Sequence, residues 1–140
     1  MADLSRAAVV ALATAVAVVV NLIVYAIGRA AGGTFLFTAD GRRMEVDAVT
    51  VAGFSALPLA LGLTAVALLA SRFAWAVRAA LIVGPALAVL TIATMTLPAD
   101  LDTTSTITLA ACHLPLAPIV VVAATALGRR ARRAAGPVAA

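Results

Sequence analysis

The stretch TITLAACHLPLAPIVVVAATAL, from Thr106 to Leu127, decides the fold of this chain. It is 22 residues long and carries no formal charge, although it contains the one histidine and the one cysteine of the sequence, His113 and Cys112. As a helix rising about 1.5 Å per residue it would measure roughly 33 Å, which is enough to cross a bilayer core of about 30 Å. The sequence therefore predicts a transmembrane helix over 106–127.

The composition is that of a membrane protein. Hydrophobic residues make up 64% of the 140 residues and charged residues 11%, and the mean hydropathy is +1.15. Soluble domains average about 45–50% apolar and about 25% charged residues. The net charge of +4 does not indicate nucleic-acid binding, because the arginines flank apolar stretches. The lipid bilayer is the expected partner.

Three further apolar stretches, 7–28, 51–70 and 79–97, are also long enough to span a membrane. The first is longer than the apolar core of a signal peptide, about 7–15 residues, so we expect an uncleaved helix. Pro58 and Pro85 lie inside the second and third stretches and should bend them, because proline removes a backbone donor. The expected fold is an all-α membrane protein, a four-helix transmembrane bundle forming a single integral membrane domain.

The connection over residues 33–50 carries the signals of a β-hairpin. Thr34–Thr38 and Met44–Thr50 are rich in β-branched or alternating residues, and Asp40-Gly41 lies between them. Asp-Gly between two such runs favours a tight hairpin turn. We predict a small hairpin on the outer face of the bundle between the first two helices, with an irregular loop as the alternative.

The arginines predict the orientation. If both termini are cytoplasmic, seven arginines lie inside and three, at positions 29, 42 and 43, lie outside. Arginine-rich short loops stay in the cytoplasm, so we expect a multi-pass protein of the cell membrane with both termini inside. The seven inner arginines are Arg6, Arg72, Arg78, Arg129, Arg130, Arg132 and Arg133.

Several residues at the helix ends are typical of membrane interfaces. Trp75 lies between Arg72 and Arg78, and Arg129 and Arg130 follow the fourth helix. Aromatic and basic side chains at such positions anchor a helix at the level of the lipid headgroups. The basic tail over 129–140 is expected to be disordered.

Three polar side chains are candidates for an intramembrane cluster. Asn21 and His113 each lie seven residues, roughly 10 Å, from the outer end of their predicted helix, and Tyr25 shares a face with Asn21. The first interpretation is hydrogen bonding between helices, worth about 0.6 kcal/mol on average. The second is a proton- or ligand-responsive site, since histidine titrates near neutral pH.

Catalytic and metal sites are less well supported by the sequence. A metal site needs several ligands, and no second histidine or intramembrane carboxylate accompanies His113. A hydrolase triad would need a carboxylate near His113, and Asp100 and Asp102 lie too close to the surface. A single cysteine also excludes an internal disulfide. We therefore expect no catalytic residues, no metal and no cofactor.

Small residues recur at helical spacing in two places. One ladder is Ala7, Ala11 and Ala15, and the other is Ala80, Gly84 and Ala88. Small side chains let helices approach closely. Packing inside the monomer is the expected role of both ladders.

The chain resembles an uncharacterised family of small actinobacterial four-helix membrane proteins, a domain of unknown function. The resemblance rests on Asn21-Leu-Ile-Val-Tyr25 with Gly28, the polar hairpin-like insert, Gly84-Pro85 and His113-Leu114. Cys112 stands where members of that family often have methionine. The resemblance implies a fold and a membrane location, and it implies no activity.

Three functions are consistent with the sequence. The first is a non-enzymatic structural or interaction component of the cell envelope, whose partner would be another membrane protein or a second copy. The second is a small transporter or channel using a polar site around His113 and Asn21. Proton-coupled exporters of this size need an embedded carboxylate, which this sequence lacks. The third is an enzyme with His113 as base, and we expect that the protein is not an enzyme.

Overall fold

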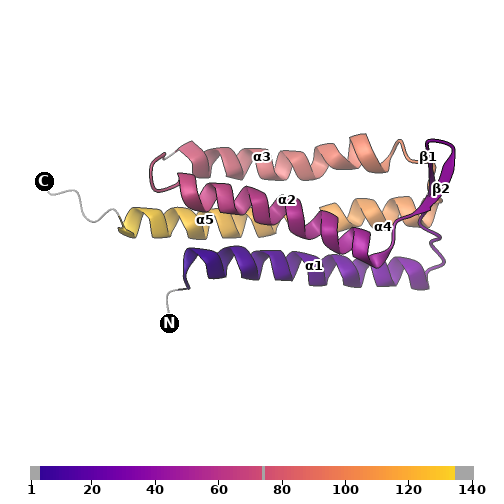
Figure 1. Cartoon of the computed structure of the whole chain (residues 1–140), viewed down its shortest axis with the longest axis horizontal. Helices are drawn as coiled ribbons and strands as arrows, with labels where there is room; N and C mark the ends of the chain where they lie inside the picture. The colour runs from indigo at the N-terminus through magenta and orange to yellow at the C-terminus, as the bar shows by residue number, and fades with distance from the viewer. Residues whose placement is uncertain (1–3, 74, 135–140) are drawn as a thin grey trace, which may run out of the picture.

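The computed structural model describes residues 4–73 and 75–134. Among these residues, four helical segments are long and apolar enough to cross a membrane. They run side by side as a long bundle, with the start of the first helix and the end of the last at one end and a β-hairpin at the other (Figure 1). The four predicted apolar helices and the small hairpin are confirmed.

In the part of the chain that the structure describes, the four spans are built from five α-helices and one π-helical segment. The first helices are α1, Arg6–Ala30, and α2, Ala48–Leu69. The third span is α3, Trp75–Thr91, continued by the π-helical segment η1, Ile92–Thr96. Two more helices, α4 over Thr103–His113 and α5 over Leu116–Ala134, form the fourth span.

Side-chain caps begin α1, α2 and α4. Ser5, Asp47 and Asp102 each accept a hydrogen bond from the backbone N–H three residues later, at 3.1, 2.7 and 2.9 Å respectively. An N-cap of this kind satisfies a donor that the helix leaves unpaired, and contributes about 0.5–2 kcal/mol in typical helices. The cap at Asp47 explains why α2 begins at Ala48, three residues before the predicted bound.

The hairpin consists of β1, Leu36–Ala39, and β2, Arg42–Glu45, paired antiparallel. Its two-residue turn is Asp40-Gly41, and both residues have positive φ, 50° and 71°. Positive φ at both positions is the signature of a type I′ turn, which matches the twist of the two strands. The second strand is shorter than predicted, because Asp47 already caps a helix.

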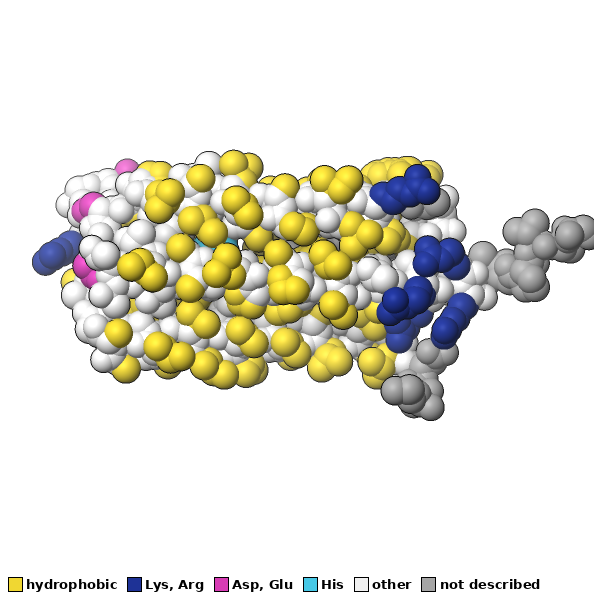
Figure 2. Space-filling view, turned by 180° about the vertical axis from the view of Figure 1, so that it is seen from behind, with side chains coloured by type: hydrophobic (Ala, Val, Ile, Leu, Met, Phe, Trp, Pro, Cys, Tyr) yellow, Lys and Arg dark blue, Asp and Glu magenta, His cyan; other side chains and the backbone are white. Residues whose placement is uncertain are grey.

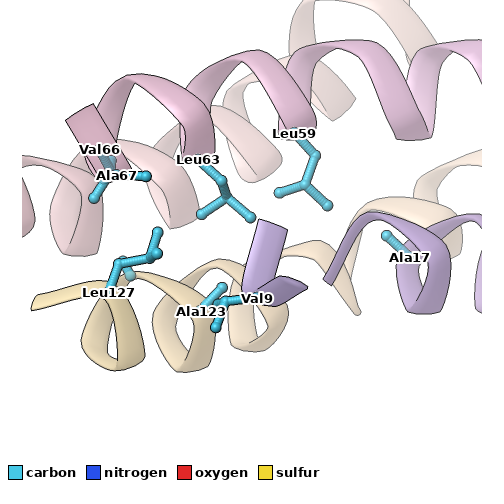
Figure 3. Close-up of a cluster of buried hydrophobic side chains, with 9 residues drawn as sticks. Val9, Ala17, Leu59, Leu63, Val66, Ala67, Ala123 and Leu127 are labelled. Atoms are coloured by element: carbon cyan, nitrogen blue, oxygen red, sulfur yellow. The ribbon is translucent and has the colours of Figure 1, made fainter. Parts of the chain in front are cut away.

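The main core joins α1, α2 and α5 in the half of the bundle away from the hairpin. Leu63 and Leu127 are 2% and 1% exposed, and Figure 3 shows them pointing toward one another from α2 and α5. Gly84 of α3 packs directly on α5, since a Cβ built there would lie 2.5 Å from Cγ1 of Val120. The ladder around Gly84 therefore packs inside the monomer, as expected.

The fourth span is not the single helix that the sequence predicted. It is broken at Leu114 and Pro115, directly after His113. Proline at 115 and 118 supplies no backbone donor, so two hydrogen bonds of the regular ladder are missing close together at the break. Leu114 N–H instead bonds Ala111 C=O at 3.2 Å, and Ile119 N–H bonds Pro115 C=O at 3.2 Å as α5 begins.

The arginine-rich end also differs from the prediction. Residues 129–134 continue α5 as helix and are not a disordered tail, and residues 135–140 lie outside the described part. By contrast, α2 and α3 run without interruption through Pro58 and Pro85. The bends expected at these two prolines stay a prediction.

Candidate functional site

Asn21 forms a buried hydrogen bond between α1 and α2. Its side chain is 2% exposed, and Nδ2 donates a hydrogen bond to Ser55 Oγ at 2.8 Å. Ser55 in turn donates to Val51 C=O at 2.7 Å. Within the described residues, Asn21 Oδ1 is buried and has no hydrogen-bond partner. The NH₂ group of the Asn21 amide is therefore hydrogen-bonded, and its oxygen is not.

His113 and Tyr25 find their partners elsewhere. The Nδ1 atom of His113 donates to Leu109 C=O, 2.7 Å away on its own helix. The contact from α4 to the level of Asn21 is made by Cys112, whose Sγ lies 3.7 Å from the Asn21 carbonyl oxygen. Across the described chain, no hydrogen bond links His113 to Asn21 or Tyr25. The three residues predicted as a cluster are thus not joined by hydrogen bonds.

Tyr25 belongs to the hairpin end of the bundle. Its ring centroid lies 4.6 Å from that of Phe35, with the planes tilted by 55°. The guanidinium carbon of Arg29 lies 5.9 Å from the Tyr25 centroid and 5.7 Å from the Phe35 centroid. Both distances are within the range of cation–π attraction, about 6 Å.

A polar network at the hairpin end of the bundle centres on Asp102. Its Oδ2 accepts from the Thr34 hydroxyl at 2.6 Å, from the Thr34 N–H at 3.0 Å and from the Ser105 hydroxyl at 2.6 Å. Ser105, which is fully buried, also accepts from Phe35 N–H at 2.8 Å. The hydrogen bonds from Ser105 and then Thr34 hold the pKa of Asp102 far below its usual range.

Two further contacts fasten the hairpin. Asp100 Oδ1 accepts from Thr38 N–H at 2.7 Å, which lowers the pKa of this carboxyl. Arg29 forms an ion pair with Glu45 at 2.9 Å and donates to Thr34 C=O at 2.9 Å. We call this assembly the hairpin cap. It comprises β1, β2, Tyr25, Arg29, Thr34, Phe35, Asp100, Asp102 and Ser105.

Phe35 is held in a strained conformation within the hairpin cap. Its φ is 56°, and its side chain is 0% exposed. A bulky residue rarely adopts the left-handed region, and such strain persists only where surrounding contacts over-determine it. Ser105 on the backbone and Tyr25 on the ring supply those contacts.

Sequence reasoning missed the hairpin cap because it treated Asp100 and Asp102 as surface charges. The usable signal is Asp102 three residues before Ser105, which is the spacing of an N-cap. The partners Thr34 and Phe35 lie about seventy residues earlier, and no local pattern pairs them with Ser105.

The expected interface anchors gather at the opposite end. Trp75 is 60% exposed, and its ring centroid lies 6.1 Å from that of Phe73. Arg72, Arg78 and Arg129 are exposed. Arg130 is held by hydrogen bonds from Nε to Leu4 C=O at 2.6 Å and from Nη1 to Ala126 C=O at 3.2 Å. Figure 2 shows a cluster of basic side chains at this end, with an apolar surface between the cluster and the acidic end.

Two grooves mark the surface of the bundle. One, of about 660 Å³, lies between α1 and α2 near Arg6. The other, of about 340 Å³, lies between α1 and α4 beside Gly28 and Thr108. Neither is lined by Asn21 or His113. In the described residues, no group of three histidine, cysteine or acidic side chains is placed to hold a metal ion.

Comparison with known proteins leads to a family without an assigned role. Residues 2–135 match a family described as a family of unknown function (DUF6069). No curated protein matches the chain, and no solved structure matches it. The family match covers nearly the whole chain.

Proposed function

Since the chain belongs to the DUF6069 family, whose description names no activity, we propose a function from the arrangement of its side chains. We propose that it is a multi-pass integral protein of the cell membrane without enzymatic activity. It acts there as a structural or interaction component of the cell envelope and presents the hairpin cap on the outer side.

Membrane insertion is supported by the outward-facing side chains. Large apolar residues on the helices point away from the bundle, including Leu61, Ile82 and Val122, which are 68–70% exposed. In water each would carry a transfer cost of about 1.5–3 kcal/mol relative to burial, whereas a bilayer removes that cost. The apolar surface lies between the arginine end and the acidic end (Figure 2).

The orientation is supported by the separation of charges. The start of α1, the turn between α2 and α3, the start of α3 and the end of α5 meet at one end of the bundle (Figure 1), and they carry seven of the ten arginines. Five of the six acids lie in the segments at the other end. The excess of arginine favours the cytoplasm for the first end.

The hairpin cap is the feature that supports a role in interaction. The backbone N–H groups of Thr34, Phe35 and Thr38 are all bound by side chains at the start of α4 or in the loop before it, so the hairpin is fixed on the bundle. At the same time β2 is exposed along its whole length, from Arg42 to Glu45. An exposed strand held rigidly above a membrane is suited to contact with another protein.

Thiol labelling tests the topology. With Cys112 replaced by alanine as background, Gly41→Cys should react in intact cells with a reagent that does not cross membranes. A cysteine at Arg72, in the turn between α2 and α3, should react only after lysis. Labelling in the reverse pattern would mean that the orientation is inverted, and equal labelling of both sites in intact cells would remove the spanning topology.

A small transporter or channel is the second candidate, and one observation favours it. The fourth span is broken at Leu114 and Pro115, and the third span ends in the π-helical η1. Broken helices and π segments recur at transport sites in membranes. The two grooves, however, are not lined by His113, and an embedded carboxylate is absent from the predicted spans. The first function is therefore the better supported.

A further inference from the structure

The groove between α1 and α2 has the shape expected for a single lipid chain. Its volume is about 660 Å³, and its lining is almost entirely apolar, from Arg6 at the mouth to Ala15 at the far end. Ala15 follows Arg6 by nine positions, which correspond to roughly 14 Å of helix. That is close to half of a bilayer core of about 30 Å, or the depth of one leaflet.

The floor of this groove overturns one expectation. Ala7, Ala11 and Ala15 form a small-residue ladder that should pack inside the monomer, yet all three are exposed. They face the groove together with Ala60 and Thr64 of α2. Because these side chains are short, they do not fill the space between α1 and α2, and a groove remains along the surface.

The mouth of the groove is positively charged. Arg6 is held across it by a hydrogen bond from Nη1 to Ala67 C=O at 3.1 Å, and its guanidinium makes no other hydrogen bond to the residues that the structure describes. Arg6 is also the first residue of α1, so the positive end of the helix dipole adds to its charge. Arg130 lies nearby, bound to Leu4 C=O at 2.6 Å.

We propose that this groove is a binding site for an anionic phospholipid of the leaflet at the arginine end. The acyl chain lies along Ala7, Ala11 and Ala15, and the phosphate binds the guanidinium of Arg6. A phosphate suits this position because arginine and a helix N-terminus both favour phosphate oxygens. The site rests on the proposed membrane insertion.

Native mass spectrometry of the full chain in detergent tests the site. The probes are phosphatidylglycerol and phosphatidylcholine with identical acyl chains, titrated separately. The first tightly bound phosphatidylglycerol should exceed phosphatidylcholine in affinity by about fivefold, since one arginine at an anionic surface contributes about 1 kcal/mol and 1.4 kcal/mol is tenfold.

Two variants separate headgroup from chain binding. Arg6→Gln should remove the preference for phosphatidylglycerol and should weaken phosphatidylcholine less, because the choline of that lipid already neutralises its phosphate. Ala11→Phe should fill the groove and weaken both lipids. The matched controls are Arg72→Gln, which removes an exposed arginine outside the groove, and Ala86→Phe, which enlarges an exposed alanine of α3. Both controls should bind lipid like the unaltered chain.

Three results would overturn the site. One is equal affinity for the two lipids in the unaltered chain, and another is loss of binding in the controls as large as in Arg6→Gln and Ala11→Phe. The third is a dimer that Ala11→Phe converts to monomer while lipid binding stays the same, which would assign the groove to a second copy. Since this measurement is made in detergent, its failure is distinct from a failure of the thiol labelling in cells.

Discussion

Thr34 and Asp102 are 68 positions apart in the chain, and yet one carboxylate oxygen of Asp102 binds both the hydroxyl of Thr34, at 2.6 Å, and its backbone N–H, at 3.0 Å. The same residue is the N-cap of α4. The start of the fourth span and the start of the hairpin therefore share one anchor. Any change that releases Asp102 should loosen both elements together.

Ser105→Ala should be the most damaging conservative change in the hairpin cap. Its hydroxyl accepts from Phe35 N–H at 2.8 Å, and the side chain is fully buried. Leaving a buried donor unpaired costs about 1–3 kcal/mol, and the strained Phe35 would lose a contact that holds it. The measurement is thermal unfolding in detergent.

Ser71→Ala is the matched control for this prediction. Ser71 is exposed and only donates to a carbonyl of its own helix end, Leu68, at 3.1 Å. Its replacement should change the free energy of unfolding by less than about 0.5 kcal/mol. Equal Tm values for Ser105→Ala and the unaltered chain would contradict the role assigned to Ser105.

The acids of the hairpin cap predict a stability that falls in acid. The folded-state pKa values of Asp100 and Asp102 lie below 3.8, the value expected for the unfolded chain. A carboxyl with a lowered pKa contributes stability above the unfolded value, and this is lost as the pH falls through the folded value. Titration of these two carboxyls should therefore leave the Tm in detergent unchanged from pH 8 to 5. It should lower the Tm below about pH 4.

Asp102→Asn isolates the contribution of one carboxyl to that acid loss. The amide retains an acceptor but cannot titrate, so the variant should be less stable at neutral pH and should lose less stability below pH 4. A curve that remains parallel to that of the unaltered chain throughout would mean that Asp102 is not a source of the acid sensitivity.

The sequence predicted the elements of this fold well and their long-range contacts poorly. Hydropathy identified the four apolar stretches, and Asp40-Gly41 identified the hairpin, because both signals are local. The pairing of Asn21 with Ser55, and of Thr34 with Asp102, depends on how helices are rotated about their axes. Depth and spacing placed Asn21 and His113 at one level but did not determine the direction of either side chain.

The break in the fourth span could have been predicted from the sequence. Pro115 and Pro118 are three residues apart, and each removes a backbone donor, but a total length of 22 apolar residues favoured one continuous helix. The hydrogen bonds at Leu114 and Ile119 resume the helix on either side, so the span still crosses as α4 and α5.

His113 and Asn21 should respond differently to replacement by leucine. Asn21 joins two helices through Ser55, so Asn21→Leu should cost about 0.6–1.7 kcal/mol, the range for polar bonds between transmembrane helices. The only hydrogen bond of His113 in the described structure is to its own helix, so His113→Leu should cost less. Thermal unfolding in detergent measures both, and a larger loss for His113→Leu would contradict this ranking.

The same preparation tests whether His113 is a switch. If it only packs and bonds to Leu109, the Tm curves of the unaltered chain and of His113→Asn should run parallel from pH 5 to 8. A step near neutral pH that is present only with His113 would favour a titrating site, and with it the transporter alternative.

Gly84 and Gly62 provide a paired test of helix packing. Each lies inside a span, Gly84 in α3 and Gly62 in α2, but their surroundings differ. A Cβ on Gly84 would meet Val120 of α5 at 2.5 Å, whereas a Cβ on Gly62 would meet nothing within 4 Å. Gly84→Ala should therefore force α3 and α5 apart and cost about 1–3 kcal/mol, as overpacking does. Gly62→Ala should be neutral or stabilise by up to about 1 kcal/mol, because alanine is the better helix former. Thermal unfolding of the two variants in one detergent gives the comparison, and equal effects of both substitutions would mean that α3 does not pack on α5 at Gly84.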